Sequence, residues 1–168
     1  MKKFNLLLEM SDFMTEDNSL VSELQLAENQ PLNYLSQFAR VLQERGIDKA
    51  IPELPWLALV DGLASRNLLE ELDWKDDPEE LIAVCLRLTE NHSQSTEIKT
   101  SITSIEASLS DDIEEFLPVL NRYLYKHGIQ LVWIDINSDS YPLTILASDK
   151  VNEAKRLALD AGYGTIKY

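Results

Sequence analysis

The sequence predicts an α+β fold in which about six helices pack on a small, mostly antiparallel sheet. One observation is that apolar residues recur at helical spacing through roughly the first 45 residues, and strand patterns begin only after Asn67. The other is a pair of apolar runs, Ile129–Ile136 and Tyr141–Ala147, which flank a four-residue turn. We therefore expect the hairpin 129–147 to form the centre of the sheet.

The helices are predicted from apolar stripes and from the residues that begin and end helices. Asp77 followed by Pro78 is typical of a helix N-terminus, and Pro31 suits a first helical position. Gly46 and Gly128 are expected to end their helices. The predicted helices are 2–13, 15–29, 31–45, 56–64, 78–88, 110–127 and 148–161.

Two further strands and one loop complete the expected fold. Leu68–Trp74 is predicted to be a strand with Leu68, Leu72 and Trp74 on one face, although Glu70 interrupts the alternation. Thr165–Tyr168 could add a short terminal strand. Glu90–Thr100 is almost wholly polar and is expected to be a mobile loop, whereas 102–109 fits either a loop or a short helix. The three tryptophans are expected on core faces.

A chain of 168 residues is expected to form a single domain. Residues 1–30 either pack on that domain or form an appended helical arm. The chain holds 29 acidic and 15 basic residues, which give a formal charge of −14. Such a charge disfavours nucleic acids and anionic membranes as partners, and it suits a basic protein, a cation or simple solubility.

The remaining composition favours a cytoplasmic protein. Cys85 is the only cysteine and lies in an apolar helical pattern, which is typical of a buried thiol in a reducing compartment. The apolar run Leu6–Leu8 is too short for a secretory signal. No run reaches the roughly 20 apolar residues of a membrane span.

The densest charge lies between Glu70 and Glu80, where seven of eleven residues are acidic. This cluster could hold a divalent cation or supply paired carboxylates for acid–base chemistry, and its members are Asp73, Asp76, Asp77, Glu79 and Glu80. The alternative is that they cap the helix that follows and form a solvated face. We favour the second interpretation.

The segment from Asp135 to Asp139 begins like a calcium-binding loop, with oxygen-bearing side chains at alternate positions. The rest of that loop is missing, because Ser140 replaces the glycine and Leu146 replaces the bidentate glutamate. We therefore expect a hairpin turn in which these side chains bond nearby backbone amides.

Two blocks of the chain resemble a known family. They are Trp56-Leu57-Ala58-Leu59-Val60-Asp61 followed by Glu71-Leu72-Asp73-Trp74-Lys75, and Asp135 with Asp139-Ser140-Tyr141. Together they resemble the bacterial domain-of-unknown-function family 6630 over roughly 32–168. The resemblance implies a bacterial cytoplasmic α+β protein and supplies no activity. The polar members of these blocks, Asp61, Asp73, Asp139 and Tyr141, are the candidate binding residues, together with Asp76 and Asp77.

The functional hypothesis rests on a strong negative charge and on the lack of a recognisable catalytic motif in the sequence. The sequence contains no dinucleotide-binding glycine motif, phosphate loop or nucleophile elbow, and we expect no cofactor. The favoured hypothesis is a non-enzymatic protein-binding module, such as an adaptor or immunity protein, with a basic protein as partner. One alternative is a metal-dependent enzyme that uses Asp61, Asp73, Asp77, Asp135 or Asp139. The other is an acidic mimic of nucleic acid.

Overall fold

The structure is a computed structural model, and it describes residues 2–105 and 112–168. This part of the chain contains nine α-helices and one four-stranded antiparallel sheet, so the α+β class is confirmed and the helices outnumber the expected six. The helices are α1 (Lys2–Ser11), α2 (Asn18–Asn29), α3 (Pro31–Gln37), α4 (Ala39–Glu44), α5 (Leu54–Ala64), α6 (Pro78–Leu88), α7 (Ser95–Ile102), α8 (Ile113–Leu124), the 3-10 turn η2 (Tyr125–His127) and α9 (Val151–Ala161). The strands are β1 (Leu69–Asp73), β2 (Ile129–Asp135), β3 (Ser140–Ala147) and β4 (Thr165–Lys167).

The sheet has the order β1-β3-β2-β4, with every neighbouring pair antiparallel. The predicted hairpin forms its centre, and Trp133 of β2 lies opposite Leu143 of β3. Strands β1 and β4 are the two edges of the sheet in the described part of the chain. The sheet therefore ends on one side at Leu69–Asp73 and on the other at Thr165–Lys167.

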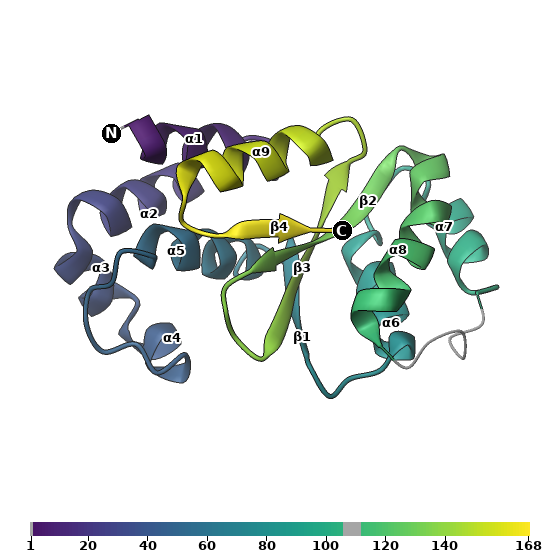
Figure 1. Cartoon of the computed structure of the whole chain (residues 1–168), viewed down its shortest axis with the longest axis horizontal. Helices are drawn as coiled ribbons and strands as arrows, with labels where there is room; N and C mark the ends of the chain where they lie inside the picture. Colours follow the sequence, from purple (N-terminus) through teal and green to yellow (C-terminus); the bar gives the residue numbers. More distant parts are fainter. Residues whose placement is uncertain (1, 106–111) are drawn as a thin grey trace.

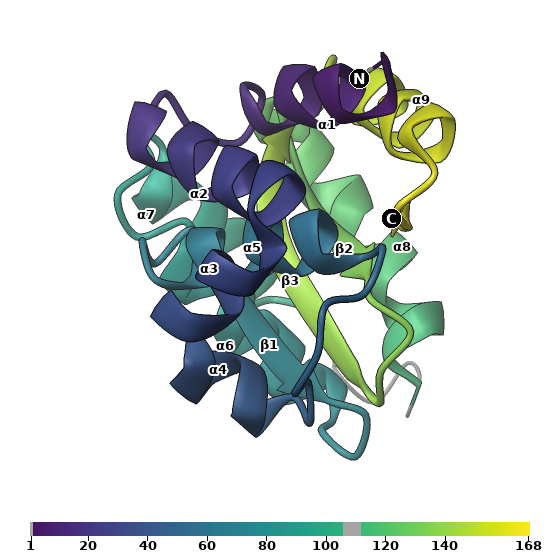
Figure 2. The same cartoon turned by 90° about the vertical axis from the view of Figure 1, so that its left-hand side faces the viewer.

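Helices cover both faces of the sheet, and each face has its own apolar core (Figures 1 and 2). The first core lies among α1, α2, α5 and α9, and the sheet contributes Leu69, Val132, Ile134, Leu146 and Ile166 to it. The second core lies among α6, α7 and α8, and the sheet contributes Leu72, Leu131, Trp133 and Leu143. Because side chains alternate along a strand, a sheet buried on both faces needs apolar residues at consecutive positions, as β2 has.

The sequence left open whether residues 1–30 pack on the domain or form an appended arm. In the structure, the described part of this segment contributes to the first core. Phe4, Leu7 and Met10 of α1 are buried, as are Leu20 and Leu24 of α2. Helix α1 packs along α9, and Figures 1 and 2 show the two helices side by side. Helix α2 packs on α5.

Helix α5 crosses the first core, and its tryptophan is held by main-chain contacts from distant segments. Trp56 is 1% exposed, and its indole Nε1 donates to the Asp135 carbonyl at 2.9 Å. Gly164, just before β4, lies so close that an added Cβ would stand 2.3 Å from the same nitrogen. The glycine therefore permits β4 to leave α9 across the face of the indole ring.

Three local expectations were wrong. The polar segment 90–100 is not one mobile loop, because Ser95–Ile102 forms α7, which buries Ile98 and Ile102 four residues apart. The expected helix 31–45 is divided into α3 and α4, because Phe38 leaves helical geometry with φ −108° and ψ 23°. Trp74 is 57% exposed and lies outside the core, since β1 ends at Asp73. The segment 102–109 was left open between a loop and a short helix; α7 ends at Ile102, and residues 106–109 lie outside the described residues.

Among the helices of the described ranges, none is long and apolar enough to cross a membrane.

Candidate functional site

Edge strand β1 is held between two arginines, one on each face of the sheet. Glu71 points toward α5 and binds Arg45, which follows α4. Glu70 points toward α6 and accepts from Arg87 Nε at 2.8 Å. The consecutive glutamates that interrupt the alternation of β1 therefore each have a cationic partner on their own side.

Arg45 joins β1 to α5 in a largely buried ion-pair network. Its Nη2 lies 2.6 Å from Asp61 Oδ1, with side chains only 17% and 9% exposed, and the same nitrogen contacts Glu71. Burial raises the pKa of Asp61, although the Arg45 guanidinium opposes that shift. Burial alone would lower the pKa of Arg45, but its bonds to Glu71 and Asp61 outweigh burial and raise it. Arg45 thus has two carboxylate partners, and its guanidinium stays protonated.

The network continues from β1 into the turn between β2 and β3. Ser140 Oγ donates to Glu71 Oε2 at 3.0 Å, and it lies 2.9 Å from Ser138 Oγ. The backbone N–H of Trp74 donates to the Asp139 carbonyl at 3.1 Å. These contacts fix the end of β1 to the hairpin turn.

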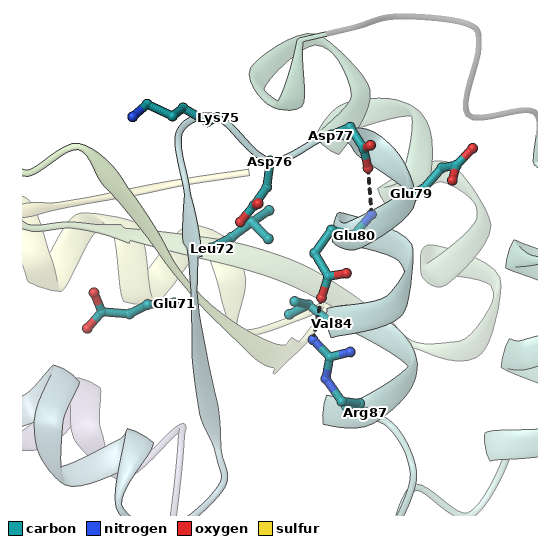
Figure 3. Close-up of a pocket in the computed structure, with 9 residues that line it drawn as sticks. All are labelled: Glu71, Leu72, Lys75, Asp76, Asp77, Glu79, Glu80, Val84 and Arg87. Carbon is teal, nitrogen blue, oxygen red and sulfur yellow. Dashed lines mark hydrogen bonds and ion pairs between the residues drawn. The ribbon is translucent and has the colours of Figure 1, made fainter.

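A groove of about 730 Å³ lies between β1 and α6, and Figure 3 shows its lining. Leu72 from β1 and Val84 from α6 provide its apolar surface. The charged lining residues are Glu71, Lys75, Asp76, Asp77, Glu79, Glu80 and Arg87. Five carboxylates and two cations line this acidic groove, although the Glu71 side chain points to the α5 side of β1, where it binds Arg45.

Three of the predicted binding residues organise the β1–α6 connection, and two of them, Asp76 and Asp77, line the acidic groove. Asp77 is the N-cap of α6 and accepts from the Glu80 N–H at 3.0 Å. Asp76 Oδ2 accepts from the Asp73 N–H at 2.8 Å, and Asp73 Oδ1 accepts from the Lys75 N–H at 3.0 Å. Each carboxylate therefore has a local backbone partner, as the capping interpretation expected.

The other predicted residues lie elsewhere. Asp61 is in the ion-pair network on the opposite face of β1 from the acidic groove. Tyr141 packs its ring edge-on to Trp133, with centroids 4.6 Å apart, and burial followed by the charge of Glu114 raises the pKa of its phenol. Asp139 is exposed in the β2–β3 turn.

Asp135 behaves as a turn residue. Its Oδ1 accepts from the Asn137 N–H at 2.9 Å, and its Oδ2 pairs with Lys167 at 2.9 Å. Burial alone would raise the pKa of Asp135, but these two partners outweigh burial and lower it. Asn137 adopts φ +55°, a left-handed conformation that asparagine tolerates in tight turns.

Within the described ranges, no three His, Cys, Asp or Glu side chains converge as metal ligands would. The structure thus brings Asp73, Asp76 and Asp77 together and leaves Asp61, Asp135 and Asp139 apart from them. The sequence analysis missed Arg45, Glu71 and Arg87. The one available signal was the adjacent pair Glu70-Glu71 inside an otherwise plausible strand.

The open edge of β1 borders the acidic groove. Glu71 lies opposite Pro142, which has no N–H, so this pair cannot exchange hydrogen bonds. By the alternation of antiparallel pairs, Leu69 and Glu71 direct their N–H and C=O groups away from β3. Glu71 is an exposed residue although its side chain is only 28% exposed, so its main chain contributes much of that exposure.

Comparison with known proteins found one match. No curated protein and no solved structure matches the chain. The match to a family extends further toward the N-terminus than the resemblance over 32–168 predicted, and it includes most of α1. The chain belongs to the family described as domain of unknown function (DUF6630), whose model matches residues 6–168.

Proposed function

We propose that this chain is a non-enzymatic protein-binding module that takes an extended, basic segment of a partner protein along the open edge of β1. The observation that carries the proposal is the exposed main chain of Glu71 beside the acidic groove. An adaptor or an immunity-like protein would use such an edge to capture one partner.

The main chain of β1 supports the pairing half of the proposal. An extended peptide can add to a sheet when the edge strand offers unpaired N–H and C=O groups, and main-chain hydrogen bonds then provide affinity. Glu71 directs such groups away from β3 and is exposed, whereas Leu69 is 2% exposed, so its main chain is covered. The Asp73 N–H is already bound by Asp76, so pairing would stop near Leu72.

The charge around β1 supports the specificity half. Inward-pointing charges on an edge strand discourage pairing with neutral or acidic strands. Glu70 and Glu71 have this arrangement, and Asp76 and Glu80 add carboxylates on the α6 side. A segment with alternating lysines would place its cations on that side, where rim charges accelerate association and select the partner.

A small hollow on the other face of β1, in which Val41 is the one apolar lining residue, supports alternation in the partner. On the α5 side of β1, a hollow of about 300 Å³ is lined by Val41, Glu44, Arg45 and Glu71. Because neighbouring residues of a strand point to opposite faces, a peptide with lysines toward α6 would direct its other side chains into this hollow. A small aliphatic residue such as valine suits it.

The test is titration with a short peptide of alternating lysine and valine, followed by amide hydrogen exchange. Binding should slow exchange of the Glu71 amide, because the added strand accepts its hydrogen bond. The same peptide carrying N-methyl groups on its pairing edge should bind about tenfold more weakly or worse. Equal binding of the methylated peptide would refute strand addition.

Matched charge variants test the acidic groove. E79Q/E80Q removes two carboxylates that line it, and E9Q/E153Q removes two exposed carboxylates on α1 and α9. Exposed pairs contribute about 0.2–1 kcal/mol each, so the first variant should weaken peptide binding about two- to tenfold and flatten its salt dependence. The second variant should bind as the wild type does. Equal losses in both would show that only net charge matters.

A further inference from the structure

A second hollow, separate from the acidic groove, lies between the segment that joins α4 to α5 and the β2–β3 turn. Its volume is about 500 Å³, within the range of roughly 300–1,000 Å³ that is typical of small-molecule sites. Figure 2 shows the α4–α5 segment running beside the hairpin turn. We call this hollow the α4–α5 pocket.

The inner wall of the α4–α5 pocket is apolar, and Trp56 in it is held by specific contacts. Ile47 and Ile51 come from the α4–α5 segment, Trp56 and Leu57 from the start of α5, and Ile136 from the end of β2. Trp56 is fixed by its bond to the Asp135 carbonyl and by the close approach of Gly164. A wall of aliphatic and aromatic side chains in fixed positions suits the apolar body of a ligand.

The mouth of the pocket carries three carboxylates, from Glu44, Glu53 and Asp139. Within the described ranges, the side chains of Glu53 and Asp139 make no hydrogen bond and no ion pair, although Glu53 occupies the N-cap position of α5. Glu44 pairs only loosely with Arg40, at 3.8 Å and in solvent. These carboxylates therefore retain negative charge that a cationic ligand could neutralise.

The cations near the pocket do not cancel this charge. Arg45 lines the pocket, but its guanidinium is already matched by Asp61 and Glu71. Lys3 borders a neighbouring hollow that shares Glu53 and Tyr163 with this pocket, without forming an ion pair there. The field at the mouth is thus negative, and an anionic ligand is disfavoured.

We propose that the α4–α5 pocket binds a small amphipathic amine, whose apolar body lies against Trp56 and Ile136 and whose ammonium group lies at the acidic mouth of the pocket. This pocket shares Glu44 and Arg45 with the small hollow on the α5 side of β1, whereas Glu53, Asp139 and the apolar wall belong to it and not to the peptide edge. The proposal concerns a free small molecule, and a lysine side chain of a partner is the competing source of the same ammonium group.

The test is an NMR titration of the wild-type protein with phenethylamine, read at the three indole N–H resonances. The Trp56 resonance should shift saturably, whereas those of Trp74 and Trp133 should not. The neutral analogue 2-phenylethanol and the anionic analogue 3-phenylpropionate should bind at least about threefold more weakly. Equal shifts with all three probes, no shift of Trp56, or a shift confined to Trp74 beside the acidic groove would overturn the proposal.

Charge-matched variants and one further probe complete the design. E53Q/D139N should weaken phenethylamine binding about threefold or more, and E9Q/D149N, which removes two exposed carboxylates elsewhere, should leave it unchanged. Nα-acetyl-lysine amide tests the competing source, and its tighter binding at Trp56 would assign the pocket to a partner's lysine and refute the small-molecule proposal. The comparison of probes on the wild type stands even if a variant fails to fold.

Discussion

At the scale of single residues, the two arginines that hold β1 differ in what their removal would leave behind. Arg45 is largely buried and neutralises Asp61, whose second oxygen has no hydrogen-bond partner in the described structure. Arg87 is 49% exposed, and both of its carboxylate partners reach solvent. A buried charge that loses its partner is costly, whereas an exposed one is solvated by water.

Arg45→Met should therefore lower the free energy of unfolding by about 2–4 kcal/mol. The control Arg87→Met should lower it by less than about 1 kcal/mol. Urea unfolding followed by circular dichroism at neutral pH measures both. Similar losses from the two substitutions would mean that Asp61 is hydrated in the folded protein, and that the network is not a buried one.

At the scale of elements, the connection between α9 and β4 depends on a glycine for a steric reason. A Cβ at position 164 would stand 2.3 Å from Trp56 Nε1, while one at Gly128 would meet nothing within 4 Å. Gly128 instead needs its φ of +75°, which ends η2 in the left-handed conformation. Gly164 is therefore needed because of close packing, and Gly128 because of its backbone conformation.

Gly164→Ala should destabilise the protein by about 2 kcal/mol or more, because the indole ring must move and its bond to Asp135 is strained. Gly128→Ala should cost about 1 kcal/mol through backbone conformation alone. Thermal unfolding measures both, and the Trp56 indole resonance should shift only in the first variant. An unshifted resonance in Gly164→Ala would show that β4 moves instead of the ring.

The elements that the sequence predicted correctly are those with local causes. The hairpin 129–147 was visible because its two runs are contiguous, and the start of α6 because Asp77 and Pro78 are adjacent. Helix α7 was missed because it buries only Ile98 and Ile102, so its polar surface dominates the pattern. The site was harder to predict, since the partners of Glu70 and Glu71 lie at residues 87 and 45, and such pairing has no local signal.

At the scale of the whole molecule, the sheet is shared by two cores. Consecutive residues of β2 alternate between them, with Val132 and Ile134 in the first core and Leu131 and Trp133 in the second. Neither set of helices can leave the sheet without exposing one face of the same strands. We therefore expect the two cores to unfold together.

Tryptophan fluorescence can follow the cores separately, because Trp56 lies in the first and Trp133 in the second. Leu7→Ala and Leu120→Ala should each lower the free energy of unfolding by about 3 kcal/mol, since each leucine is fully buried in one core. In backgrounds that retain only Trp56 or only Trp133, each substitution should shift both unfolding curves equally. Curves that separate would divide the molecule into two cooperative units. Leu32→Ala, at a residue 73% exposed, is the control and should change little.

The packing of α1 along α9 also has a consequence for how the chain folds while it is being synthesised. Residues 2–11 are made well before the helix that covers them, which is formed by residues 151–161, and Ile166 completes the same core. The apolar face of α1 is therefore fully covered only after α9 has been made. The second core, built between residues 72 and 143, can close earlier, so the nascent chain should depend on chaperones mainly through its first helix.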